Sequence, residues 1–91
     1  MNLAEFVKDR DEALLSLDYD KIIAYGNKWG VNWGKMPKNN EGFWVSVHMA
    51  RTALRSLPLE ERMKSKQWLI ERGYTPMDDG DLPAILSEEE K

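Results

Sequence analysis

The sequence predicts an all-α protein, a compact bundle of about four helices arranged as two helical hairpins with a partly disordered acidic C-terminal tail. Apolar residues recur at spacings of three and four along most of the chain, which is the period of a helix. Clusters of glycine, proline and asparagine separate these segments, and no alternating strand pattern is present. We expect one helical domain over residues 1–76 and an acidic tail over residues 77–91.

The first hairpin is predicted from two capped segments. Asn2 opens an Asn-x-x-Glu capping pattern, which predicts a helix over residues 3–16. The core stripe of this helix is expected to consist of Leu3, Val7, Leu14 and Leu17. Asp18 is placed to cap a second helix over residues 19–29. Gly30 would end that helix in the left-handed conformation.

The second hairpin follows a loop over residues 30–40, which holds two glycines, a proline and three asparagines. Asn40 caps a predicted third helix that runs to about Ser56. A fourth helix starts at Ser56 or Pro58 and continues to about Arg72. The core stripe of the third helix is expected to consist of Phe43, Val47, Ala50, Leu54 and Leu57.

Charge is sorted along the chain, although the net charge is only -3. Residues 1–20 carry two cations and six anions, residues 21–72 carry ten and four, and residues 73–91 carry one and six. All four tryptophans lie in the basic middle. Flat apolar rings beside cations form a plausible surface for an acidic or phosphate-bearing partner.

Several classes of protein are disfavoured by composition. The chain has no cysteine, so neither a disulfide scaffold nor a cysteine-based metal site or nucleophile is available. No apolar run approaches the ~18 residues of a membrane span, and charge near the N-terminus disfavours a signal peptide. We expect a cytoplasmic protein with no membrane contact, no cofactor and no metal.

The leading candidate site is a stripe beside the core of the third helix, formed by Trp44, His48, Arg51 and Arg55 at spacings of four, three and four. Two guanidinium groups one turn apart can clamp a phosphate or carboxylate, and an indole offers a stacking surface. In the structural alternative, Trp44 and His48 lie at the boundary between core and surface, and the two arginines pair with acids of the first helix. His48 fits a hydrogen-bonded boundary group better than a catalyst, so no catalytic residue is predicted.

A second candidate is the loop with Trp33, Lys35 and Lys38, since an aromatic ring and two cations on a connection can close over a ligand. Alternatively, the tryptophan plugs one end of the bundle. Further cations on the fourth helix, among them Arg62 and Lys66, are interpreted as a solvated face.

Three segments carry a family resemblance: Phe43 to Ala53, Ser65 to Tyr74, and the acidic run at 78–81. Together they resemble small uncharacterised helical proteins carried by phages and prophages of Gram-positive bacteria. The resemblance implies a context and no catalytic residue. Such accessory proteins often bind and block host machinery, including defence systems.

The expected function is therefore that of a non-enzymatic binding protein, an accessory or anti-defence factor of a mobile element. It would occupy a host protein surface or sequester a phosphorylated small ligand. The alternative is a nucleic-acid-binding module that uses the basic, tryptophan-rich middle. We rank it second because the acidic ends lie within reach of the same surface. The sequence is also compatible with a homo-oligomer.

Overall fold

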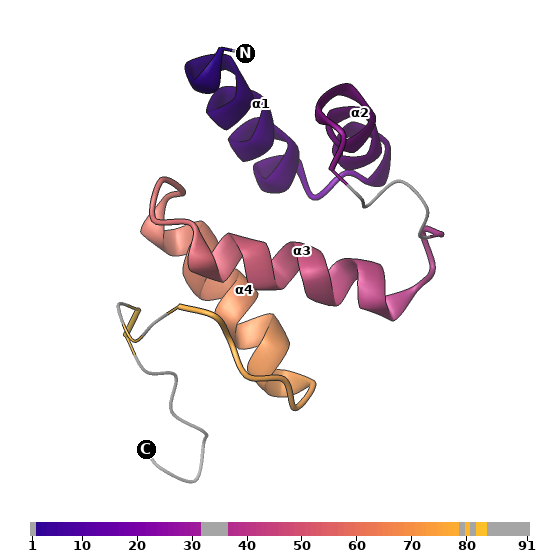
Figure 1. Cartoon of the computed structure of the whole chain (residues 1–91). Coiled ribbons are helices and arrows are strands. Elements are labelled where there is room, and N and C mark those ends of the chain that lie inside the picture. The colour runs from indigo at the N-terminus through magenta and orange to yellow at the C-terminus, as the bar shows by residue number, and fades with distance from the viewer. Residues whose placement is uncertain (1, 32–36, 79, 81, 84–91) are drawn as a thin grey trace, which may run out of the picture. The chain divides into compact units, whose positions relative to one another are not determined.

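A computed structural model describes residues 2–31, 37–78, 80, 82 and 83, and over these residues the protein is built of helices and turns, with no strand (Figure 1). The predicted all-α class is confirmed. No helix in the described part of the chain combines the length and apolar character needed to cross a membrane. The four helices are α1 (Leu3–Ser16), α2 (Tyr19–Trp29), α3 (Glu41–Ala53) and α4 (Leu59–Glu71).

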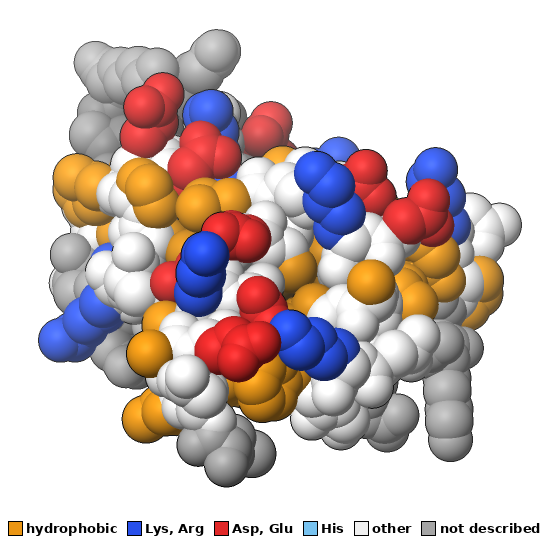
Figure 2. Space-filling view, turned by 90° about the horizontal axis from the view of Figure 1, so that it is seen from above, with side chains coloured by type: hydrophobic (Ala, Val, Ile, Leu, Met, Phe, Trp, Pro, Cys, Tyr) orange, Lys and Arg blue, Asp and Glu red, His pale blue; other side chains and the backbone are white. Residues whose placement is uncertain are grey.

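The chain divides into two units, Met1–Val47 and His48–Lys91, and the division falls inside α3. The first unit contains the predicted α1–α2 hairpin, whose helices lie side by side (Figure 1). The face seen in Figure 2 carries acidic and basic side chains next to one another, with hydrophobic side chains exposed between them.

The caps of the first hairpin are those the sequence predicts. Asn2 Oδ1 accepts a hydrogen bond from the backbone N–H of Glu5 at 3.1 Å. Asp18 Oδ1 accepts from two backbone N–H groups in the first turn of α2. Gly30 ends α2 with a φ of 73°, in the left-handed region that glycine adopts without steric cost.

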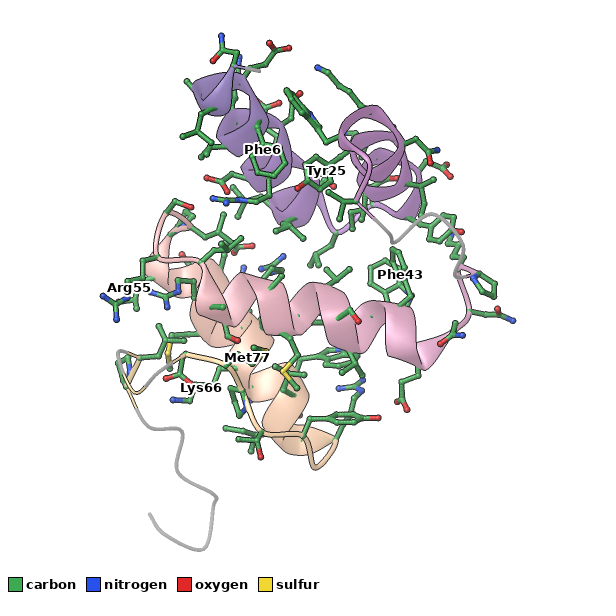
Figure 3. All side chains as sticks on the ribbon, in the orientation of Figure 1. Phe6, Tyr25, Phe43, Arg55, Lys66 and Met77 are labelled. Atoms are coloured by element: carbon green, nitrogen blue, oxygen red, sulfur yellow. The ribbon has the colours of Figure 1, made fainter. Side chains whose placement is uncertain are left out.

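The core of the first unit joins α1 and α2 through aromatic and aliphatic side chains. Leu14 and Ile22 are fully buried. The ring of Phe6 lies 5.9 Å from that of Tyr25, and both rings point between the two helices (Figure 3). Leu3, which the sequence places in the core stripe, is instead 68% exposed because it lies in the first turn of α1.

The third helix is shorter than predicted, whereas the fourth lies within about a residue of its predicted bounds. Helix α3 ends at Ala53, before Ser56, and Leu54 is only half-buried. Helix α4 follows Pro58 and is closed by a backbone hydrogen bond from Tyr74 N–H to Leu69 O at 2.9 Å.

The predicted tail begins with residues that belong to the second unit. Asp78 and Leu82 are buried, and the backbone N–H of Met77 donates to Thr52 Oγ1 at 3.1 Å. The first residues of the predicted tail therefore pack against the second unit. The reason is that Asp78 has a buried cation, Lys66, as its partner. Residues 84–91 lie outside the described part of the chain.

Candidate binding surface

The stripe predicted on α3 does not form an exposed cationic face. The side chain of Arg51 is fully buried, and His48 is only 8% exposed. Trp44 is half-buried, and its indole Nε1–H donates to the backbone carbonyl of Lys38 at 2.7 Å. Arg55 is exposed at the connection between α3 and α4 (Figure 3). Trp33 and Lys35 of the predicted loop site lie outside the described residues.

Arg51 is held inside the second unit by α4. Its Nη2 donates to the Glu61 backbone carbonyl at 3.0 Å and to Glu61 Oε1 at 3.2 Å. The same carboxylate accepts from Lys64 at 2.8 Å. Hydrogen bonds from Lys64 and then Arg51 lower the pKa of Glu61, although desolvation opposes them. The structural alternative expected acidic partners in the first helix, whereas this acid comes from α4.

Two of the cations predicted to form a solvated face on α4, Arg62 and Lys66, are also buried. Arg62 Nη2 donates to the backbone carbonyl of Thr52 at 2.7 Å. Lys66 Nζ lies 3.3 Å from Asp78 Oδ2, 3.4 Å from Leu82 O and 3.2 Å from Pro83 O. Because a buried charge requires a partner, these contacts fix the segment that follows α4. The solvated-face prediction is wrong for Arg62 and Lys66.

A hydropathy pattern does not find these residues. The buried positions of α4 are Arg62, Ser65, Lys66 and Leu69, which share one helical face through their spacing. Only the last of them is apolar. Two features of the sequence could have indicated this buried face: the helical spacing of the four positions, and the acid Asp78 as a partner for Lys66.

His48 belongs to the same polar interior. Its Nδ1 lies 2.9 Å from Ser65 Oγ, and its ring stacks on Trp68 with centroids 4.2 Å apart. The Arg72 guanidinium lies 4.1 Å from the Trp68 ring centroid. Burial lowers the pKa of His48 to about 4, and the charges of Arg51 and Arg72 add to this effect. The imidazole is therefore neutral at neutral pH.

The pairing of His48 with Ser65 has the residue types of a general base and a nucleophile. Ser65 is fully buried, however, so its hydroxyl does not meet a substrate. The pair instead satisfies two buried polar groups.

An open groove of about 380 Å³ lies on the α1–α2 hairpin. Helix α1 contributes acidic side chains to its lining and helix α2 contributes basic ones. Tyr25 and two alanines complete the lining. The lining residues are Asp9, Glu12, Ala13, Lys21, Ala24, Tyr25 and Lys28.

Ion pairs link α1 and α2 at one end of the groove. Lys28 Nζ lies 2.7 Å from Asp9 Oδ2 and 3.0 Å from Glu5 Oε1, and the Trp29 indole donates to Asp9 Oδ2 at 3.0 Å. The hydrogen bond with Lys28 lowers the pKa of Asp9, and the same bond raises the pKa of Lys28. Glu12 and Lys21 also line the groove, are exposed, and form no ion pair within the described part of the chain.

Comparison of the chain with protein-family models, with curated proteins and with solved structures found no match in any of the three. The described residues contain no cluster of three or more side chains suited to hold a metal ion. Function is therefore inferred from the chemistry of the groove and of the buried cations.

Proposed function

We propose that the protein is a non-enzymatic binding protein, an accessory or anti-defence factor of a phage or other mobile element, and that it occupies the surface of a host protein. The observation that carries the proposal is the α1–α2 groove, with acidic side chains on one wall and basic side chains on the other. Charges of both signs around an aromatic ring suit a protein partner, because complementary charges select the partner and its orientation. The mobile-element context comes from the family resemblance of the sequence.

A protein partner is favoured over a phosphorylated small ligand or nucleic acid because of where the cations lie. Arg51, Arg62 and Lys66 are buried and donate to acceptors in their own unit. Lys28 and Lys64 are in ion pairs with acids of the same chain. A phosphate group would have to displace these partners, and affinity for nucleic acid depends on cations that can approach the backbone phosphates.

The test is capture of a partner from bacterial lysate, with and without nuclease. Lys21→Glu reverses one exposed charge in the groove, and Lys38→Glu makes the same change at an exposed lysine outside it. We expect a nuclease-resistant protein partner that the wild-type chain and Lys38→Glu capture and that Lys21→Glu loses. Capture that disappears with nuclease, or that Lys21→Glu leaves unchanged, would contradict the proposal.

A further inference from the structure

We propose that the α1–α2 groove seats a single helix of the partner protein. That helix carries acidic side chains along the edge facing α2 and basic side chains along the edge facing α1. This inference rests on the proposed function, since it names the chemistry of the partner at the same groove. It follows from three features of the groove: the order of its charges, the shape of its floor and the unequal engagement of its two ends.

The charges are segregated by helix and repeat at helical spacing. The acidic wall comes from α1, where Asp9 and Glu12 lie three residues apart on one face of the helix. The basic wall comes from α2, where Lys21 and Lys28 lie seven residues apart. Seven residues span two helical turns, so a helix lying along the groove returns the same face to both lysines. A partner helix with acidic side chains one heptad apart can therefore match the basic wall.

The floor suits the side chains of one helix. Ala13 and Ala24 are small, and with the nearly buried Tyr25 they are the uncharged residues that line the groove. A hollow between two helices receives the ridge of side chains on a third helix. The volume of about 380 Å³ holds such side chains while the backbone of the partner helix stays above the groove.

The two ends of the groove differ in what they offer. Asp9 and Lys28 are already bound to each other, whereas Glu12 and Lys21 form no ion pair within the described residues. The partner's charges therefore meet their main contacts at Glu12 and Lys21. Exposed ion pairs add little affinity but strongly affect register and selectivity. Selectivity between charge patterns is accordingly the property to measure.

A single helix fits better than a second copy of this hairpin. A second copy would bring its own groove against this one, and both hollows would remain unfilled. A helix ridge fills the hollow directly. Self-association of the chain through this groove would therefore contradict the proposal.

The experiment uses two stapled helical peptides of identical composition, each about three heptads long so that the helix is stable in water. Both have a leucine and alanine stripe flanked by glutamates and lysines. In the segregated peptide, all glutamates lie along one edge and all lysines along the other. In the alternating peptide, the two charges alternate along each edge. Reversing a peptide's direction exchanges its edges, so the segregated peptide always has one orientation that fits.

The matched protein variant is the double swap Glu12→Lys with Lys21→Glu, which keeps composition and net charge and makes each wall alternate in sign. Both side chains are exposed and lie outside the ion pairs that Lys28 makes with Glu5 and Asp9, so the hairpin should fold, as circular dichroism will check. By fluorescence anisotropy, we expect the wild-type chain to bind the segregated peptide about tenfold more tightly than the alternating one. The swapped chain should show the opposite preference.

Three results would overturn the proposal. The first is that neither peptide binds. The second is that both peptides bind the wild-type chain equally. The third is that the swapped chain keeps the wild-type preference. A concentration-dependent dimer in sedimentation that the single change Lys21→Glu disrupts would assign the groove to a second copy instead. If the peptides fail while Lys21→Glu still abolishes lysate capture, the proposed function stands and the helical partner does not. If capture is also insensitive to Lys21→Glu, both fail.

Discussion

Lys66 illustrates how a single buried cation organises the end of this chain. Its ammonium group gathers a carboxylate oxygen of Asp78 and the backbone carbonyls of Leu82 and Pro83 (Figure 3 shows Lys66 on α4). A buried ammonium is costly unless it is paired and hydrogen-bonded. These three oxygens therefore tie the segment after α4 to the second unit.

Replacing Asp78 by Asn should lower the free energy of unfolding by about 1–3 kcal/mol at pH 7, because Lys66 then stays buried without an opposite charge. Urea denaturation measures the change. Glu71→Gln removes an exposed acid of α4 and serves as the control. Equal midpoints for Asp78→Asn and the wild-type chain would contradict the assigned role of the ion pair.

The same variant should lose its effect in acid. Burial raises the pKa of Asp78, but hydrogen bonds from Lys66 and from the Leu82 backbone outweigh burial and leave the pKa below its ordinary value of 3.8. A depressed carboxyl pKa stabilises the folded state above that value, and this contribution is lost as the pH falls through the folded-state pKa. The difference in unfolding free energy between wild type and Asp78→Asn should therefore shrink below about pH 4.

His48 should make stability depend on pH in a higher window. Its folded-state pKa is about 4, against 6.5 when unfolded, so the unfolded chain binds more protons between these values. The free energy of unfolding should fall by on the order of 2 kcal/mol as the pH drops from 6.5 towards 4. His48→Gln, which can retain a hydrogen bond to Ser65, should flatten the curve above pH 4.5. An unchanged slope in urea titrations of that variant would show that another group titrates.

At the scale of the elements, α4 shows why a helix can be located correctly and oriented wrongly. Its start after Pro58 and its end before Gly73 follow from local backbone chemistry. Its buried face contains Arg62 and Lys66, whereas its apolar Leu59 is 57% exposed. An apolar stripe alone therefore misassigns the face of α4 that packs inward.

Leucine truncations distinguish the predicted core from the observed one. Leu69→Ala should cost about 2–5 kcal/mol, because Leu69 is fully buried in α4. Leu54→Ala should cost clearly less, because Leu54 is half-buried and follows the end of α3. Thermal or urea unfolding of the two variants gives the comparison. A larger loss for Leu54→Ala would restore the core stripe expected from the sequence.

At the scale of the whole molecule, the segregation of charge along the sequence does not translate into an equally basic surface. Part of the positive charge of residues 21–72 is neutralised by acids from other segments, as in the pairs of Lys28 with Asp9 and Lys66 with Asp78. Arg51 and Arg62 are buried as well. The sequence therefore overstates the charge available to a polyanion.

The chain should accordingly fail to bind a short DNA duplex or single strand in the micromolar range at ~50 mM salt. An electrophoretic mobility shift assay tests this, repeated at ~200 mM salt to expose any electrostatic component. Binding at the lower salt that weakens steeply at the higher one would favour the nucleic-acid alternative over a protein partner.

The sequence by itself determined the class of this protein and the positions of its helices, because caps and breakers act within one or two turns. Asn2 and Asp18 cap the helices they were expected to cap, and Gly30 ends α2 as predicted. Phe43 and Val47 of the predicted core stripe are fully buried. These features depend on local geometry and on helical period.

Only the tertiary structure decided which polar residues are buried and where a concave surface lies. The partner of Lys66 is twelve residues away at Asp78, and the groove combines side chains from two helices. Arg51, expected at the surface, is buried because Glu61 on the next helix supplies acceptors for it. Such pairings depend on how helices meet in space, and the hydropathy of one helix carries no information about them.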